Sequence, residues 1–332
     1  MNVESSMVAR KIRAFPVTTT AVSLETVDCS FCGSPDYLPY DSVDEWRIVK
    51  CNRCGFCFTN PRPSAEDAAA FYTMGYFRGE EKERLNLLND DGSFKVGADL
   101  CYDQRILDIE SNLDRRGSLL EIGAATGAFL RVMENRGWVV QGIEVSDEAV
   151  KLARINDRID LYCGCLEDFR TDETYDVIGM YQSLEHVPNP AYVIDRAYDL
   201  LNPGGLIIIE VPNLNGFDIK RSEERKLQSY DLPLHLNHFT PEFLAGKLKA
   251  AGFSIIDLDR YYANFIIRAV ERRERSRRPP GSTRQNMATG EDALLSTCHL
   301  PMSKKESNWK THLLKYASRL FPGWRFTIVA RK

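Results

Sequence analysis

Strand-like and helix-like segments alternate along the middle of this chain, and this alternation constrains the fold more than any other feature. Apolar runs of strand length lie at 118–122, 139–145, 160–163, 175–181, 206–211 and 253–258. Helical patterns separate most of them, at 127–136, 146–155, 192–201 and 240–252. Such alternation is typical of a mainly parallel sheet with helices on both faces. We therefore expect an α/β fold here.

Several helix ends carry the side chains that helix termini prefer. Ser146 precedes one helical pattern and suits the N-cap position. Thr240 precedes Pro241, which combines an N-cap residue with proline in the first helical position. Gly252 follows the last turn of that helix, where a left-handed residue often ends a helix. These positions predict the starts of two helices and the end of one.

Two Cys-x2-Cys pairs stand near the N-terminus. Cys29 and Cys32 form the first pair, and Cys51 and Cys54 form the second after an interval of 18 residues. This spacing is typical of a zinc site built from two short knuckles. Four thiolates complete a tetrahedral shell and leave no open position. We therefore expect a small N-terminal zinc ribbon whose Zn²⁺ is structural. The remaining cysteines lack ligand spacing, and core packing is their expected role.

A glycine-containing loop, Glu121–Gly127, joins the first of the expected core strands to a helix. Small residues there allow a ligand to approach the backbone at the carboxyl end of the strand. Glu144 ends the next strand, where a carboxylate can accept hydrogen bonds from ribose hydroxyls. The carboxylate of Glu121 would repel a pyrophosphate but suits a cationic ligand. These residues argue against NAD and favour a sulfonium or an amine.

With the segments that follow, the chain resembles the class I S-adenosylmethionine-dependent methyltransferases. The motifs that carry the resemblance are Glu121–Gly127, Glu144, Tyr175–Ile178, Ser183–Pro190, Leu201–Gly205 and Val211–Asn213. They occur in the family's order and cover about residues 118–260. The resemblance implies a Rossmann-like sheet of seven strands whose last strand is antiparallel, and it implies S-adenosylmethionine as the cofactor.

The same resemblance implies which residues surround the cofactor. The glycine loop and Glu121 would lie near the methionine moiety, Glu144 near the ribose, and the 164–167 loop near the adenine. Ala125 replaces a glycine found in many members, and its small side chain should still permit binding. Cys165 stands where an Asp is common, so Glu167 or a backbone group is expected to contact the adenine amino group. The expected cofactor-binding residues are Glu121, Gly123, Ala124, Ala125, Gly127, Glu144, Val145, Leu166, Glu167 and Tyr181.

The ribbon narrows the resemblance. Its second knuckle runs into the segment Cys54–Ser64, and this combination is similar to the deoxysugar C-methyltransferases of secondary-metabolite and surface-polysaccharide pathways. The likeness is good for the ribbon and the core and poor beyond residue 262. It implies a small-molecule substrate, a nucleotide-sugar or a glycoside. The acceptor atom, carbon, oxygen or nitrogen, stays open.

Histidine is the expected base, because methyl transfer to many acceptors requires the loss of a proton. The resembling sugar enzymes carry a Glu-His pair with an aromatic residue three positions later. By that pattern His235 stands at the position of the base, Leu234 replaces the Glu, and His238 stands at the aromatic position. His186, after the fourth core strand, is a third candidate. The alternative for each is a histidine that only hydrogen-bonds to the backbone.

Three other interpretations stay open. Glu185 and His186 match part of a Glu/His set that could hold Mg²⁺, as in quinone O-methyltransferases. A zinc-ribbon RNA methyltransferase is a second interpretation. Residues 29–60 hold three basic against four acidic residues, which makes a poor phosphate surface, so we expect no nucleic-acid partner. A non-catalytic S-adenosylmethionine-binding scaffold is the third.

Charge and hydropathy complete the expectations. The formal net charge of −4 hides a basic C-terminal part, since 15 Lys+Arg stand against 5 Asp+Glu from residue 261 onward. No apolar run reaches the ~20 residues of a membrane helix. The N-terminal segment lacks the apolar region of a secretory signal. We therefore expect a cytoplasmic protein without a membrane span. Its oligomeric state is open.

Five segments are expected along the chain. A leader and the zinc-ribbon domain occupy 1–63, and a helical connector or lid occupies 64–117. The S-adenosylmethionine-binding core occupies 118–262. A variable insertion follows at 263–319, and the final core strand lies within 320–332.

Overall fold

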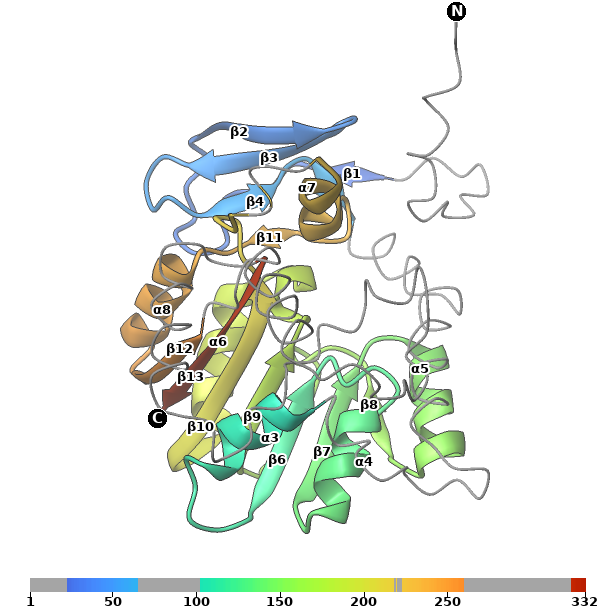
Figure 1. Cartoon of the computed structure of the whole chain (residues 1–332). Helices are drawn as coiled ribbons and strands as arrows, with labels where there is room; N and C mark the ends of the chain where they lie inside the picture. Colours follow the sequence, from blue (N-terminus) through green and yellow to red (C-terminus); the bar gives the residue numbers. More distant parts are fainter. Residues whose placement is uncertain (1–22, 65–101, 218, 220–222, 260–323) are drawn as a thin grey trace, which may run out of the picture.

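The computed structural model describes residues 23–64, 102–217, 219, 223–259 and 324–332 (Figure 1). The expected insertion at 263–319 and most of the expected connector therefore lie outside the described residues. No helix in the described ranges is both long and apolar enough to cross a membrane.

The larger of the sheets has seven strands in the order β12-β13-β10-β9-β6-β7-β8. Its strands are β6 (Ser118–Ile122), β7 (Val139–Glu144), β8 (Leu161–Cys163), β9 (Tyr175–Tyr181), β10 (Leu201–Pro212), β12 (Ser254–Asp259) and β13 (Arg325–Arg331). Strands β6 to β10 pair in parallel, whereas β13 runs antiparallel to both β10 and β12. The Rossmann-like methyltransferase sheet and its antiparallel last strand are thus confirmed.

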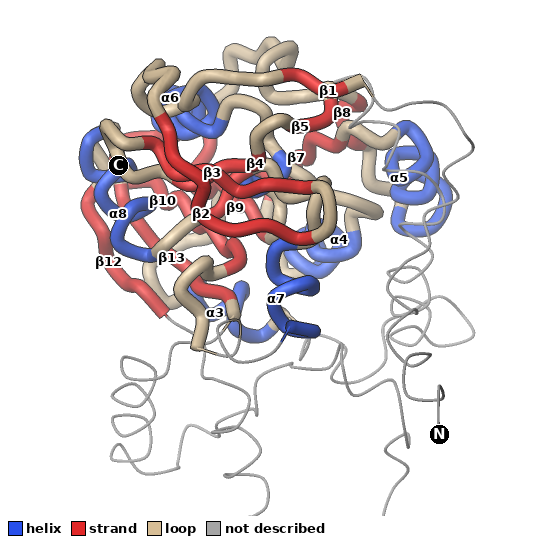
Figure 2. Tube along the Cα trace, turned by 90° about the horizontal axis from the view of Figure 1, so that it is seen from above, coloured by secondary structure: helices blue, strands red, loops and turns tan. Residues whose placement is uncertain are grey.

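Helices cover both faces of this sheet (Figure 2). They are α3 (Asp103–Glu110), α4 (Ala128–Asn135), α5 (Asp147–Leu152), α6 (Pro190–Leu200) and α8 (Pro241–Ala250). Helix α7 (Glu223–Tyr230) lies beside the N-terminal ribbon instead (Figure 1). In β10, Ile207 and Ile209 pack into a cluster with α6 and α8, and Ile208 packs with α3 and α4 on the other face. Successive strand residues point to opposite faces, so both faces of a central strand must be apolar.

The predicted helix starts at Ser146 and Thr240 are confirmed. The Ser146 hydroxyl accepts a hydrogen bond from the amide of Ala149, and the Thr240 hydroxyl accepts one from Phe243. Two helix boundaries differ from prediction, and β10 begins at Leu201, five residues before the expected strand. Helix α6 begins at Pro190, because Asn189 caps it. Helix α5 ends at Leu152, and a π-helical turn, η2 (Ala153–Asp157), replaces its expected last turn.

A second sheet of four strands forms the ribbon. Its order is β11-β4-β3-β2, with β2 (Tyr37–Val43), β3 (Trp46–Cys51), β4 (Cys57–Thr59) and β11 (Asn237–His238). A two-stranded pair, β1 (Leu24–Glu25) with β5 (Arg62–Pro63), closes the N-terminal part. Strand β11 comes from the segment before α8, so a piece of the core completes the ribbon sheet (Figure 1).

Four phenylalanines join the ribbon to α8. Phe56 lies 5.0 Å from Phe243 and 5.6 Å from Phe239, measured between ring centroids. Phe31 meets Phe56 edge-on at 4.7 Å and Phe243 at 5.1 Å. Such aromatic contacts add about 0.5–1.5 kcal/mol per pair to the burial of their area. The ribbon is therefore packed onto the core through a continuous apolar cluster.

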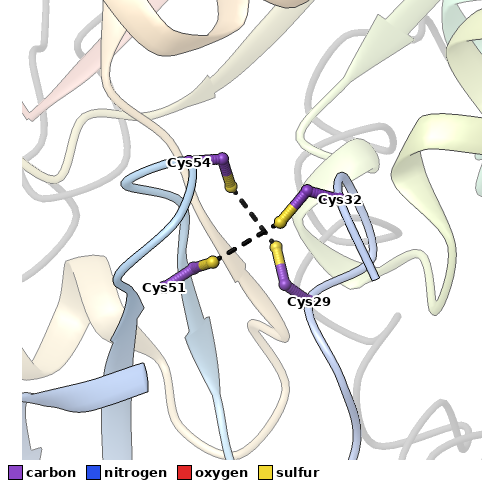
Figure 3. A group of neighbouring side chains, drawn as sticks. All are labelled: Cys29, Cys32, Cys51 and Cys54. Atoms are coloured by element: carbon purple, nitrogen blue, oxygen red, sulfur yellow. Dashed lines mark hydrogen bonds between the residues drawn. The ribbon is translucent and has the colours of Figure 1, made fainter. Parts of the chain in front are cut away.

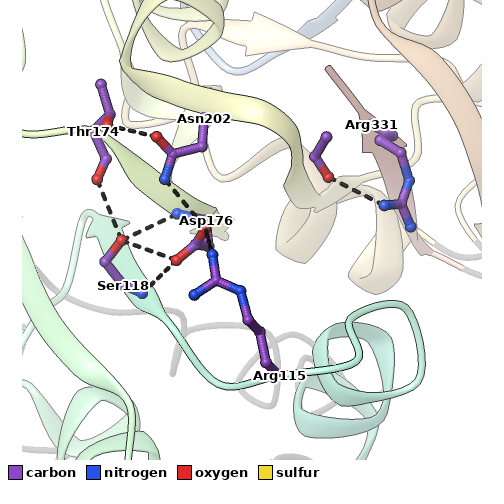
Figure 4. Close-up of polar contacts among 7 residues, drawn as sticks. Arg115, Ser118, Thr174, Asp176, Asn202 and Arg331 are labelled. Atoms are coloured by element: carbon purple, nitrogen blue, oxygen red, sulfur yellow. Dashed lines mark hydrogen bonds and ion pairs between the residues drawn. The ribbon is translucent and has the colours of Figure 1, made fainter.

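Polar side chains hold together the opposite edge of the large sheet, where β6 and β9 begin (Figure 4). Asp176 accepts hydrogen bonds from the Ser118 amide at 2.9 Å and from the Asn202 side chain at 3.1 Å. The Thr174 hydroxyl donates to Asn202 at 2.6 Å. This network fixes the register of the central strands at the edge away from the glycine loop.

The aromatic junction gives a first testable prediction. Replacing Phe56 by Ala should lower the free energy of unfolding by about 3–5 kcal/mol, because a large buried side chain leaves a cavity. Replacing the exposed Leu38 on β2 should change it by less than about 0.5 kcal/mol. Urea denaturation of both variants measures the difference. Equal effects of the two substitutions would contradict the packing described.

Candidate functional site

The glycine loop lies at the carboxyl ends of β6 and β7. Its amides at Gly123 and Ala124 both donate to the carbonyl of Ile143, at 2.9 and 3.0 Å. Gly123 and Gly127 have positive φ angles of 79° and 76°. A Cβ at Gly123 would lie 2.5 Å from the Cβ of Ser183, so only glycine fits between the two strand ends. The loop is thus packed closely against the neighbouring strand ends.

Glu144 ends β7 and braces the loop. One of its carboxylate oxygens accepts a hydrogen bond from the amide of Ala125 at 2.9 Å, and the other accepts from Ser146 at 2.8 Å. Burial raises the pKa of Glu144, while these amides oppose the rise. A carboxylate has about four lone-pair sites, so both oxygens keep acceptor capacity for a ligand.

The loop after β8 lies beside Glu144. The amide of Gly164 donates to the Glu144 carbonyl at 2.9 Å. Leu166 packs into the core, and Val145 is half exposed. The thiol of Cys165 donates to Asp168 at 3.1 Å. The structure thus brings the glycine loop, Glu144 and the 164–167 loop to one edge of the sheet.

Arg105 of α3 lies among the buried acidic residues of this edge, and the sequence reasoning missed it. Its guanidinium lies 4.2 Å from the ring centroid of Tyr181 and 3.7 Å from a carboxylate oxygen of Glu210. Burial tends to lower the pKa of Arg105, but the nearby carboxylates of Glu210 and Glu121, with the Tyr181 hydroxyl, outweigh it and raise the pKa. Glu121 and a cation of the protein itself therefore interact electrostatically. In the sequence, Arg105 is distinguished only by its place in the expected helical connector.

His186 and His235 lie together above the end of β9. Their ring centroids are 4.8 Å apart. Nδ1 of His235 lies 2.9 Å from the Ser229 carbonyl, and Nδ1 of His186 lies 3.0 Å from the Leu234 carbonyl. A carbonyl can only accept, so both rings carry their proton on Nδ1 when neutral, and Nε2 holds the lone pair. Nε2 of His235 lies 3.9 Å from a carboxylate oxygen of Asp231.

His238 has different surroundings. Its Nε2 lies 3.0 Å from the Thr59 hydroxyl, and its ring meets that of Tyr230 at 5.6 Å. Burial, with the nearby His235, lowers the pKa of His238 to about 3. The imidazole is therefore neutral across the ordinary pH range.

Glu185 stands beside this pair in the short helix η3 (Leu184–His186) and is completely buried. Within the described ranges its carboxylate oxygens have no hydrogen-bond partner. Burial raises the pKa of Glu185 well above its usual value. Ligand atoms of Glu185, His186 and His235 all lie within 4.8 Å of one another. One carboxylate and two imidazoles in this space could hold a divalent cation.

The four cysteines of the ribbon converge in the structure (Figure 3). The sulfurs of Cys29 and Cys54 are 3.5 Å apart, as are those of Cys32 and Cys51. These distances are far too long for disulfides, whose sulfurs lie about 2.05 Å apart. A tetrahedral zinc with Zn–S bonds of about 2.3 Å would set its sulfurs about 3.8 Å apart. The donor set therefore fits zinc. Cys57 lies outside the set and is buried, which raises the pKa of its thiol to about 11.

Comparison with known proteins gives a family match for the core. Residues 99–258, just under half of the chain, match the model of a methyltransferase domain. The chain is similar to the ubiquinone biosynthesis O-methyltransferase of Saccharophagus degradans, with 32% identity over 104 residues, which are 29% of this chain and 44% of that protein. It is similar to the enzyme of the same name from Neisseria meningitidis serogroup C, with 29% identity over 134 residues, which are 37% of this chain and 56% of that one. The matches thus span about half the length of these curated relatives.

The chain is also similar to a solved structure, that of a SAM-dependent methyltransferase from Archaeoglobus fulgidus. The similarity covers 77% of this chain and 99% of that chain, with 16% identity and a TM-score of 0.48.

The cysteine cluster gives a second testable prediction. The purified chain should contain one equivalent of zinc by elemental analysis. Replacing Cys32 by Ser should remove most of the zinc and lower the midpoint of thermal unfolding, because three thiolates hold the ion more weakly and metal binding contributes to folding. Replacing Cys57 by Ala is the matched control and should leave one equivalent bound. Loss of zinc from the Cys57 variant would show that the site is built differently.

Proposed function

We propose that this chain, whose residues 99–258 are a methyltransferase domain, transfers the methyl group of S-adenosylmethionine to a small molecule. The observation that carries the proposal is the bracing of the glycine loop by Glu144 at the carboxyl edge of a Rossmann-like sheet. That edge is where open α/β sheets bind their ligands.

The residues at this edge fit the parts of the cofactor. Glu144 would accept hydrogen bonds from the ribose hydroxyls. Val145, Leu166 and Glu167 would surround the adenine. The loop from Gly123 to Gly127, with Ala124 and Ala125, would contact the methionine moiety. S-adenosylmethionine would supply the methyl group and a good leaving group. Glu121 and Arg105 carry opposite charges that would suit its amino and carboxylate groups, and Tyr181 packs against Arg105.

His235 is the proposed base. Its Nδ1 proton is held by the Ser229 carbonyl, so Nε2 is the atom that would take a proton from the acceptor. Asp231, at 3.9 Å from Nε2, would stabilise the resulting imidazolium. Asp231 lies four residues before His235. It would supply the carboxylate that is missing at position 234, where the resembling sugar enzymes carry a Glu. His186 lies beside His235 and would help to orient the acceptor. His238, whose low pKa keeps it neutral, has a positioning role in this proposal.

The acceptor that we propose is a nucleotide-linked or glycosyl sugar. The four-cysteine ribbon joined to the core supports this class, since that combination carries the resemblance to sugar methyltransferases. A structural zinc in the ribbon completes the proposal.

A phenolic O-methylation is a second candidate. The group of Glu185, His186 and His235 favours it, because a divalent cation held there could bind a phenolate oxygen. The names of the relatives are compatible with such an acceptor. An RNA acceptor fits less well, given the slightly acidic ribbon. A non-catalytic scaffold would bind the cofactor without turnover.

Cofactor binding is the third testable prediction. Replacing Glu144 by Gln should weaken S-adenosylhomocysteine binding at least tenfold, because the amide nitrogen cannot accept a hydrogen bond from Ala125 or Ser146. Replacing Glu134 on α4 by Gln, which makes the same chemical change outside the loop, should leave the affinity within twofold. Isothermal titration calorimetry measures both. No binding to the unaltered chain at millimolar ligand would contradict the cofactor assignment.

The base is the subject of the fourth prediction. Transfer of a radiolabelled methyl group is measured with nucleoside-diphosphate sugars and with catechols. With an accepted substrate, replacing His235 by Gln should lower kcat by about 10²–10⁴-fold. The affinity for S-adenosylhomocysteine should be unchanged, which separates loss of the base from loss of the fold. Full turnover by the Gln variant would exclude His235 as the base.

The same assay separates the two acceptor classes. Turnover of catechols that is abolished by chelation, restored by Mg²⁺ and lost on replacing Glu185 by Gln would favour phenolic O-methylation. Turnover of nucleotide-sugars that is insensitive to Mg²⁺ would favour the glycosyl acceptor.

A further inference from the structure

We propose that Thr59, in the ribbon, is a positioning residue for the segment 231–238, which we call the His235 loop. The ribbon would then be part of the active site as well as a folded appendage of the core. The catalytic consequence of this inference rests on the proposed function, whereas its structural content does not.

Thr59 is completely buried at the end of β4 and makes three hydrogen bonds to the His235 loop. Its hydroxyl lies 2.7 Å from the His235 carbonyl and 3.0 Å from Nε2 of His238. Its amide donates to the Leu236 carbonyl at 2.9 Å. One residue of the ribbon thus contacts three residues of the loop that carries the proposed base.

The hydroxyl of Thr59 fixes a protonation pattern. It has one proton, and the His235 carbonyl can only accept, so that proton is donated to the carbonyl. Nε2 of His238 must then donate its own proton to the Thr59 oxygen. His238 is therefore the Nε2–H tautomer, whereas His235 is the Nδ1–H tautomer. Thr59 holds the backbone of one histidine and the ring of the other.

A second set of contacts from the ribbon holds α7, the helix that supplies the hydrogen-bond acceptor for the ring of His235. Asp41 of β2 accepts hydrogen bonds from Lys226 at 2.8 Å and from Tyr230 at 3.0 Å, and both donors belong to α7. Ser229, next to Tyr230, supplies the carbonyl that accepts from Nδ1 of His235. The ribbon therefore positions His235 in two ways. Thr59 binds the backbone carbonyl of His235, and Asp41 holds the helix whose Ser229 carbonyl accepts from the His235 ring.

The core holds the same loop from below. The Leu236 amide donates to the Glu185 carbonyl at 2.8 Å, and the Asn237 side chain donates to the Val187 carbonyl at 2.7 Å. The His235 loop is therefore hydrogen-bonded to the ribbon on one side and to the core on the other. Each contact from the ribbon starts on a strand of its sheet, and β3 and β4 extend from the knuckle of Cys51 and Cys54.

Imidazole ¹⁵N chemical shifts of the full-length chain in magnesium-free buffer test this inference, because they report which ring nitrogen carries the proton. The chain has five histidines, and replacing His235 or His238 by Gln assigns their signals. The unaltered chain should show His235 as Nδ1–H and His238 as Nε2–H. Finding His238 as the Nδ1–H tautomer would overturn the proposal without any change at Thr59.

Three variants complete the test. Thr59→Val keeps the shape but removes the hydroxyl, and it should shift the His235 signals and mix the tautomers of His238. Thr59→Ser keeps the hydroxyl and should restore the original spectrum. Thr174→Val removes a hydroxyl at the opposite edge of the large sheet and should change neither histidine. Identical His235 and His238 signals in Thr59→Val and the unaltered chain would overturn the proposal.

Kinetics connect the contact with catalysis. With an acceptor accepted in the screen, Thr59→Val should lower kcat at least tenfold, leave the KM for S-adenosylmethionine within twofold and be rescued by Thr59→Ser. A kcat within twofold of the unaltered chain would overturn the catalytic part. If no acceptor is turned over, the proposed function fails, and the tautomers still decide whether Thr59 positions the loop.

Discussion

The antiparallel pairing of β4 with β11 is the contact on which the arrangement of the candidate site depends. It is only two residues long, yet it joins the four-cysteine ribbon to the segment between β10 and α8. Short pairings of this kind are not stable alone. Here the phenylalanine cluster around Phe56 excludes water on one side, and the Asp41 contacts tie α7 to the ribbon on the other. The ribbon and the core thus together support the His235 loop.

The two ends of the large sheet are stabilised by different kinds of interaction. At the edge where β6 and β9 begin, a charged side chain, Asp176, satisfies the backbone and side chains around it. At the opposite edge, the glycine loop is held by backbone hydrogen bonds, and the acidic residues Glu121, Glu144 and Glu210 are buried. Buried carboxylates are unfavourable without partners, and here Arg105 lies 3.7 Å from a carboxylate oxygen of Glu210 while two backbone amides donate to Glu144.

Much of the architecture could be predicted from the sequence. The apolar runs predicted all six core strands within 118–258, and the Ser146 and Thr240 caps predicted helix starts, because these signals are local. The cysteine spacing predicted the cluster in the same way. The strand β11 could not be predicted, since two residues with no apolar alternation carry no strand signal. Arg105 and Asp231 were missed for a related reason. Arg105 is placed by Tyr181 and Glu210, which are distant in sequence, and Asp231 reaches His235 through a turn of the chain. Neither residue lies in a recognisable motif.

The individual roles of the three histidines also depend on tertiary contacts. His235 and His238 lie three residues apart and look equivalent in the sequence. Their difference comes from the ribbon and α7, because a carbonyl faces Nδ1 of one ring and a hydroxyl faces Nε2 of the other. The nature of the hydrogen-bond acceptor decides which nitrogen keeps its lone pair, and this information is absent from the local sequence.

Ala125 has a consequence for the entropy of the glycine loop. Its φ angle of 48° lies in the left-handed region, where a side chain costs about 1 kcal/mol relative to glycine. A glycine there would remove that strain, but it would also give the unfolded chain more conformations, which costs about 0.5–1 kcal/mol on folding. The two effects nearly cancel in stability. They do not cancel in rigidity, since an alanine narrows the conformations open to the loop. The alanine therefore leaves the Ala125 amide with fewer ways to turn away from Glu144, and the loop would give up less conformational freedom on binding a ligand.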